Sequence, residues 1–403
     1  MQLAEAILNQ MKDLRKPRVK FMVILFKTAL SLMGRVNFSQ LSRYSSLNEK
    51  TYSRNFKRSF DFVHLNSLSI ERVYNPKNDY FLAIDASFIS KSGKATYGRG
   101  NFWNSIQNRS MKGLEISTIA LVDKTYNTAY TLSVKQVPPS LDDSEENAID
   151  FSVDHIKTLK QEHLTVALPR HIASDGFYAK RRFVNGALEA GFHTISKLRK
   201  DANRRYLYEP PKRQHKKRGR PRLYGSKINL DSIDLSKFSC HAIDERIRLY
   251  SGIVYSVSLK RKIHLVYVAH TDTKDKQSYA LLFSTDVTLV ARTIYCYYTA
   301  RFQIEFVFRD AKQFTGLTHC QARCKESLDF HFNMSLSLLN LARIEHRMKY
   351  PTDNEGFSMA SLKRSYTNEL LLNLFLSKLE LDPNNEKIQS VCQELRNYGS
   401  IAA

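Results

Sequence analysis

The chain has 403 residues, an apolar share of 42%, and 62 Lys plus Arg against 39 Asp plus Glu, which gives a formal net charge of +23. Such a basic balance attracts polyanions and releases their counterions on contact, so nucleic acid is the expected partner. No window approaches the roughly 20 apolar residues of a membrane span, the N-terminus lacks the apolar core of a signal peptide, and five scattered cysteines cannot form a disulfide framework. We therefore expect a soluble cytoplasmic protein without a membrane partner.

Residues 1–75 are predicted to form a helical DNA-binding domain. An apolar run over 21–33 is followed by two short amphipathic segments separated by SSLNE, a pattern typical of a helix-turn-helix. A three-helix cap with a solvated basic face is an equally good interpretation. In the helix-turn-helix interpretation, the second helix presents these side chains to DNA: Lys50, Tyr52, Arg54, Asn55, Lys57 and Arg58.

Residues 76–199 are predicted to form the first part of a catalytic core. The run YFLAIDASFIS and a hairpin turning at 123–127 indicate three antiparallel strands. A helix over 145–163, the strand RHIASD, a helix over 179–190 and the strand FHTISKLRK follow. Antiparallel strands followed by alternating helices and strands predict an α/β fold, in which a mixed sheet carries helices on its faces.

The rest of the chain is predicted to contain a β-rich insertion over 200–290, the remainder of the core over 291–349, and a helical C-terminal tail over 350–403. Two helices, over 290–314 and 325–349, belong to the core. Within the insertion, RGRPR resembles an AT-hook core, which lies in the minor groove of A·T-rich DNA. A solvated basic loop explains the segment equally well. The AT-hook interpretation assigns DNA contacts to Arg218, Arg220 and Arg222.

A stripe of polar side chains is predicted on the helix over 290–314. At 100° per residue, Tyr298, Arg301 and Glu305 share one face of a straight helix, and Lys312 falls on the same face. The other face is apolar enough to be buried, so the stripe is not needed for solubility. A carboxylate held between cations on a packed helix suggests a functional site. The apolar residues are Phe302, Ile304, Phe306 and Phe308.

Three acids are candidates for chemistry. Asp85 and Asp175 are each expected where a strand ends, and Glu305 adds a third carboxylate from the helix. Converging carboxylates are suited to holding two Mg²⁺ or Mn²⁺ ions, which can activate a nucleophile and stabilise the leaving oxygen of a phosphodiester. The structural alternatives are that Asp85 caps a turn, that Asp175 caps the following helix, and that Glu305 only pairs with Arg301 or Arg309.

The spacing Tyr298-x2-Arg301-x3-Glu305-x6-Lys312, after Asp85 and Asp175, resembles the Tyr-Arg-Glu-Lys signature of the insertion-sequence-four-like group of bacterial DDE transposases. The resemblance spans residues 75–345 and implies a ribonuclease-H-like sheet. It implies that the three acids bind two Mg²⁺ or Mn²⁺ ions, and that Tyr298, Arg301 and Lys312 contact phosphates near the scissile bond. A looser match implies DNA contacts for Lys197, Arg199, Lys200, Arg204 and Arg205.

The resemblance implies a transposase that acts at the bacterial nucleoid as a homodimer on double-stranded DNA. It would bind the inverted-repeat ends of its element, cleave there, and transfer the 3′ ends to target DNA. Some members stack a flipped base on a Trp in or near the insertion, whereas the single Trp here is Trp103, so a hairpin intermediate stays open. The alternatives are a ribonuclease-H-like nuclease without strand transfer and an inactive DNA-binding relic.

A zinc site is a weaker possibility near the second core helix. Thiolate and imidazole side chains can bind zinc when four of them form a tetrahedron. The spacing lacks a tight Cys-x2-Cys pair, and half-buried structural residues are the favoured interpretation. The side chains concerned are His319, Cys320, Cys324 and His331.

Overall fold

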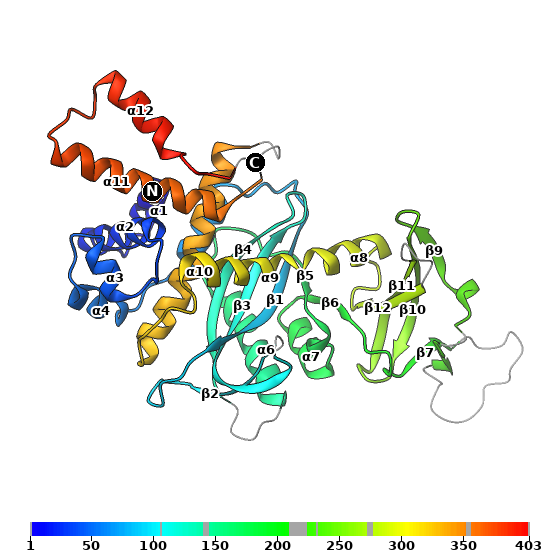
Figure 1. Cartoon of the computed structure of the whole chain (residues 1–403). Helices are drawn as coiled ribbons and strands as arrows, with labels where there is room; N and C mark the ends of the chain where they lie inside the picture. Colours follow the sequence, from blue (N-terminus) through cyan, green and yellow to red (C-terminus); the bar gives the residue numbers. More distant parts are fainter. Residues whose placement is uncertain are drawn as a thin grey trace, which may run out of the picture.

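The computed structural model describes residues 2–104, 107–139, 145–208, 224–230, 233–271, 277–351 and 356–401. The chain forms a mixed sheet of twelve strands with helices against both faces (Figure 1). This arrangement confirms the predicted α/β fold class. None of the helices in these ranges combines the length and the apolar character that crossing a bilayer requires.

One half of the sheet is built from the first six strands. Their order is β4-β3-β1-β5-β6, with β2 pairing beside β4 on the same edge of β3. Strand β3 is antiparallel to β1 and β4, whereas β5 is parallel to β1 and β6. This is the strand order of a ribonuclease-H-like fold. The strands are β1 (Tyr80–Ser90), β2 (Gly100–Asn104), β3 (Arg109–Asp123), β4 (Thr128–Val137), β5 (His171–Ala173) and β6 (His193–Lys197).

The segment predicted as a β-rich insertion continues the same sheet. Strand β12 pairs antiparallel with β6, and β11, β10, β7 and β8 follow in order, with β9 also on β10. In Figure 1 these strands extend to one side of the helical body. They are β7 (Arg204–Leu207), β8 (Tyr224–Lys227), β9 (Ser239–Ala242), β10 (Ile247–Ser256), β11 (Arg261–Thr271) and β12 (Gln277–Ser284), with a short 3-10 turn η2 (Leu235–Lys237).

Alternation along β1 sends its side chains to two separate cores. Leu82 and Ile84 pack in a cluster with α6 (Glu145–Gln161) and α7 (Arg181–Glu189). Phe81 and Ala83 pack in a second cluster with α8 (Ala291–Ala300), α9 (Gln303–Asp310) and α10 (Lys325–Lys349). Odd-numbered positions of β1 therefore face the helices that carry the predicted stripe.

The N-terminal helices share this second core rather than forming a core of their own. Phe56 packs on Phe330 of α10 with ring centroids 4.4 Å apart. The first five helices are α1 (Gln2–Gln10), α2 (Lys16–Ser31), α3 (Phe38–Arg43), α4 (Glu49–Phe56) and α5 (Phe62–Glu71). After α10 come α11 (Met359–Lys378) and α12 (Glu386–Arg396), both within the segment predicted as a helical tail.

Helices α3 and α4 occupy the positions of the predicted helix-turn-helix, but two of its proposed groove-facing side chains point inward. Tyr52 is fully buried and its hydroxyl lies 2.8 Å from that of Ser45. Asn55 accepts a hydrogen bond of 2.7 Å from Arg18 and donates to the carbonyl of Thr51. The sequence pattern was wrong at these two positions because a DNA-contacting helix and a basic helix packed on a core have the same polar composition. The exposed side chains are Lys50, Arg54, Lys57 and Arg58.

The helix predicted over 290–314 is broken into three segments. After α8, the amide of Phe302 donates a hydrogen bond of 3.2 Å to the carbonyl of Thr299. The amide of Glu305 donates one of 3.0 Å to the carbonyl of Phe302. These three-residue spacings form a tight turn before α9. A π-helical segment η3 (Ala311–Thr315) follows and ends at Gly316, whose φ is 79°. The stripe is thus not on one straight helix.

Candidate active site

Asp85 lies in the interior of β1, not at its end as predicted. Parallel pairing of β1 with β5 runs only to Ala83 opposite Ala173, so Asp85 and Asp175 both lie two residues beyond the last pair. Asp85 remains hydrogen-bonded in register with β3, opposite Thr118, so it does not cap a turn. Its position on the odd face of β1 directs it toward the helix with Glu305.

Asp175 follows β5 at the start of the 3-10 turn η1 (Gly176–Tyr178). Its Oδ1 accepts a hydrogen bond of 2.9 Å from the amide of Phe177, so the predicted capping role is present. Its main-chain carbonyl accepts a hydrogen bond of 2.6 Å from the hydroxyl of Ser196 on β6. A cap that uses one carboxylate oxygen fixes the side chain and leaves the other available for a ligand.

Arg301 connects the acids of β1 and α9. Its Nη2 lies 3.0 Å from Oε1 of Glu305, and its Nη1 lies 3.5 Å from Oδ2 of Asp85. The Arg301 side chain is only 10% exposed, against 19% for Asp85 and 39% for Glu305. Its Cζ lies 5.6 Å from the ring centroid of Tyr298, so the guanidinium is enclosed by two carboxylates and an aromatic face.

Asp175 and Glu305 lie close enough to Asp85 to affect its ionisation. Burial raises the pKa of Asp85 to about 7, and the charge of Arg301 opposes this shift. The charges of Asp175 and Glu305 raise the pKa of Asp85 further. Like charges held this close disfavour ionisation unless a cation accompanies them, and here the cation is a guanidinium.

The donor set fits a divalent metal ion in type. Asp85, Asp175 and Glu305 offer carboxylate oxygens, which are the ligands that Mg²⁺ and Mn²⁺ prefer. Their present separation is not that of a formed metal cluster, because no group of three ligand side chains in the described ranges is close enough to hold an ion. The guanidinium of Arg301 lies between the carboxylates of Asp85 and Glu305. Its Nε is buried and has no hydrogen-bond partner among the described residues of the chain.

The other members of the predicted stripe are spread along the broken helix. Lys312 lies in η3, where burial lowers the pKa of its amine. The guanidinium of Arg309 pairs with Asp310 at 2.9 Å, so it does not reach Glu305. Phe302 was predicted on a buried face, but it lies at the turn before α9 and is 48% exposed. These differences follow from the turn, which rotates α9 relative to α8.

The predicted basic stretch after β6 serves several roles. Lys197 lies at the exposed end of β6, close to Gly176 and therefore to Asp175. Lys200 lies over the ring of Tyr279 at 4.4 Å. Arg199 pairs with Asp201 on the surface.

Two further arginines of this stretch are used within the fold. Arg204 is buried, and its guanidinium donates to the carbonyls of Ala202 and Lys200 at 2.8 and 3.1 Å, so a DNA contact by Arg204 does not agree with its position. Arg205 is half-buried over the ring of Tyr224 at 5.0 Å. The predicted AT-hook residues Arg218, Arg220 and Arg222 lie outside the described residues.

A fourth acid borders the site and was missed from the sequence. Glu115 lies on β3, where burial, and then the charge of Asp85, raise its pKa to about 7. The charges of Asp85, Asp175 and Glu115 add to burial in raising the pKa of the Tyr178 phenol. A charged residue, Glu115, inside the otherwise uncharged run LEISTIALV was the available signal.

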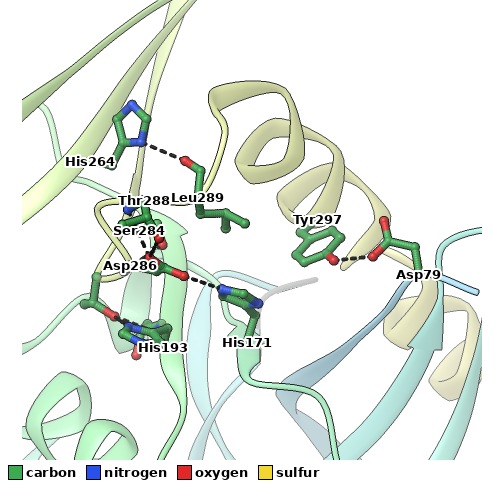
Figure 2. A network of polar contacts seen from close by, with 11 residues as sticks. Asp79, His171, His193, His264, Ser284, Asp286, Thr288, Leu289 and Tyr297 are labelled. Carbon is green, nitrogen blue, oxygen red and sulfur yellow. Dashed lines mark hydrogen bonds and ion pairs between the residues drawn. The ribbon is translucent and has the colours of Figure 1, made fainter. Parts of the chain in front are cut away.

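A polar network at the opposite end of β5 fixes α8 over the sheet (Figure 2). His171 Nε2 lies 3.0 Å from Asp286 Oδ2, and Asp286 Oδ1 accepts from the amide of Thr288 at 3.0 Å. Tyr297 of α8 donates a hydrogen bond to Asp79 and stacks on Phe81 at 4.6 Å. These contacts anchor α8 to the starts of β1 and β5, which places Arg301 and Glu305 above Asp85.

The candidate zinc ligands do not form a site. His331 Nε2 bonds to the carbonyl of Gly316 at 2.8 Å, and His319 Nδ1 accepts from the amide of Val36 at 3.1 Å. Burial raises the pKa of the Cys320 thiol to about 11, which disfavours the thiolate that zinc needs. These contacts support the structural interpretation of the four residues.

Comparison with known proteins gives one family match and similarity to solved structures. Residues 63–249 match the model of the family described as DDE superfamily endonuclease, a range that includes Asp85 and Asp175 and ends before Glu305. A solved structure of the piggyBac transposase synaptic complex with hairpin DNA is similar at 12% identity and a TM-score of 0.42, covering 98% of this chain and 81% of that one. No curated protein matches.

Proposed function

We propose that the chain is a DNA transposase whose catalytic acids are Asp85, Asp175 and Glu305. One observation carries the proposal: the three carboxylates come from β1, the end of β5 and α9, and Asp175 and Glu305 lie near enough to Asp85 to raise its pKa. The match to a DDE endonuclease model over both aspartates and the net charge of +23 support it. Its substrate would be double-stranded DNA at the inverted ends of its own element.

Within this proposal each side chain has a separate task. The three carboxylates would hold two Mg²⁺ or Mn²⁺ ions, which when bound would activate the attacking oxygen and stabilise the leaving one. Asp85 is fixed by the sheet hydrogen bonds of β1, and Asp175 by its bonds with Phe177 and Ser196, so both would hold their geometry during the reaction. Glu305 is more exposed than Asp85 and would be the ligand that adjusts.

The Tyr-Arg-Glu-Lys assignment gives the cations a role toward DNA. Tyr298 and Lys312 would contact phosphates near the cleaved bond, and Lys197 at the end of β6 would add a contact beside Asp175. Arg301 would have to leave its two carboxylates to reach a phosphate, because its guanidinium now lies between them. A DNA-bound homodimer that holds both element ends is the proposed working form.

Cleavage of labelled DNA tests the proposal. A fragment carrying the flanks of the coding region is incubated with the protein and Mg²⁺, and nicks are mapped at nucleotide resolution. Asp85→Ala, Asp175→Ala and Glu305→Ala should each abolish nicking while DNA binding persists; nicking that survives in all three refutes the acid assignment. Joining of the 3′ ends to a plasmid separates a transposase from a nuclease without strand transfer.

A further inference from the structure

A basic pocket of about 510 Å³ lies beyond the three acids. Lys91, which directly follows β1, lines one wall, and His319 and Arg323, which follow η3, line another. Arg35, from the turn between α2 and α3, completes it. The strand with Asp85 and the helical segments with Glu305 therefore both continue into this pocket.

The lining of the pocket is cationic and uncompensated. Arg35 and Arg323 are exposed, and neither guanidinium makes a hydrogen bond or ion pair with a described residue. No Asp or Glu is among the described residues that line the cavity. Arginines that only need to be solvated normally spread apart, whereas these converge with Lys91 on one hollow.

The remaining polar groups are arranged as donors. Lys91 donates one hydrogen bond to the carbonyl of Cys320, which leaves two of its three N–H groups. His319 accepts from the amide of Val36 through Nδ1, so its neutral ring carries the proton on Nε2. The Thr96 hydroxyl in the same lining is buried and has no hydrogen-bond partner among the described residues. Donors without acceptors fit an oxyanion.

Hydrogen bonds hold the walls in place. The amide of Tyr97 donates to the carbonyl of Arg323 at 2.8 Å, which joins the loop after β1 to the loop after η3. Arg99 Nε donates to the carbonyl of Lys91 at 2.9 Å. A ligand would therefore enter a formed pocket and would not have to order these loops.

We propose that this pocket binds a phosphate group of the DNA strand that passes the three acids. Lys91 is six residues from Asp85 along an extended strand, or about 20 Å. That separation corresponds to about six phosphates along one strand of a duplex. The inference rests on the proposed function, because DNA lying at the acids is what brings a phosphate to this distance.

The test is the salt dependence of DNA binding. A fluorescein-labelled duplex is titrated with the wild type, with the Arg35→Gln/Arg323→Gln variant, and with the Arg72→Gln/Lys378→Gln control. The control removes the same charge from exposed positions outside the pocket. The pocket variant should bind the duplex about tenfold more weakly at about 0.1 M salt. The negative slope of log K against log salt should become shallower by about one. The control should keep an affinity and a slope close to those of the wild type. Equal slopes for the two variants overturn the proposal.

Two further arms identify the source of the phosphate. A methylphosphonate placed singly along the duplex should weaken wild-type binding at one position, and the pocket variant should lose that sensitivity. Thermal stabilisation by inorganic phosphate that the pocket variant loses, without any change in slope, identifies a free anion and overturns the DNA assignment. If the acid variants still cleave while the slope of the pocket variant becomes shallower, the assignment of the catalytic acids is wrong and the phosphate-binding proposal is supported. If the wild type cleaves but the pocket variant keeps the wild-type slope, only the phosphate-binding proposal is wrong.

Discussion

Replacing Asp85 with asparagine should stabilise the metal-free protein at alkaline pH. Burial and two neighbouring acids place the pKa of this carboxyl at about 7, against 3.8 for a free aspartate. At about 1.4 kcal/mol per pKa unit, keeping it ionised costs roughly 4 kcal/mol even with Arg301 beside it. Asparagine keeps the shape without the charge, so the gain in free energy of unfolding should approach that value.

The pH dependence gives this prediction its sign. The folded pKa of Asp85 lies above the unfolded one, so its contribution to stability is complete below about pH 4 and is lost as pH rises through about 7. The wild type should therefore lose stability across this interval relative to Asp85→Asn. Below about pH 4 the two proteins should unfold together, because both then carry a neutral side chain.

Guanidinium unfolding in the presence of a chelator measures the difference. Profiles are compared near pH 5 and pH 8.5, with Asp201→Asn as the control, because Asp201 is an aspartate paired with Arg199 on the surface. The control should leave the midpoint almost unchanged at both pH values. The reasoning is refuted if Asp85→Asn is less stable than wild type near pH 8.5, or if its advantage does not grow with pH.

Three other substitutions test the supports of the site. Arg343→Met leaves the buried carboxylate of Asp310 paired only with Arg309. It should lower the free energy of unfolding in urea by about 3 kcal/mol. The control Arg309→Gln, at an exposed arginine, should lower it by less than about 1 kcal/mol. Gly316→Ala should lower the free energy of unfolding by about 2 kcal/mol, measured by thermal unfolding. The reason is that φ of Gly316 is 79° and an added Cβ would lie 2.6 Å from the Cβ of Val36. Gly34→Ala is the control and should leave stability unchanged, because the space around Gly34 is open. Tyr297→Phe removes the hydroxyl that donates to Asp79, and should lower the free energy of unfolding by about 1 kcal/mol. DNA cleavage should also fall, because α8 loses this anchor. Unchanged stability and cleavage would contradict the anchoring role.

Local pattern was sufficient for much of the fold. The helix predicted over Lys325–Lys349 has those bounds, because hydrophobic periodicity reports which face is buried. The order of strands and helices around Asp85 and Asp175 is as predicted, apart from the additional strand β2. The mixed sheet followed from that order. Asp175 both ends a strand segment and caps a turn, so the functional and structural interpretations of its sequence position were not exclusive.

Long-range contacts decided what the sequence could not. The turn at Phe302 depends on packing of α8 and α9 against β1, and it turns Arg301 inward between two carboxylates instead of outward along a stripe. Glu115 lies near Asp85 only because β3 pairs with β1. Tyr52 is buried because α4 packs against α2, where its ring centroid lies 5.8 Å from that of Phe21.

The most direct test of the central claim is the binding of Mn²⁺ followed by electron paramagnetic resonance. The wild type should bind Mn²⁺ at a site that Asp85→Asn, Asp175→Asn and Glu305→Gln each weaken strongly. Arg301→Gln should bind the ion more tightly than wild type, because a guanidinium no longer competes for the carboxylates of Asp85 and Glu305. Binding that is unchanged in all three acid variants would contradict the assignment of these carboxylates as one metal-holding site.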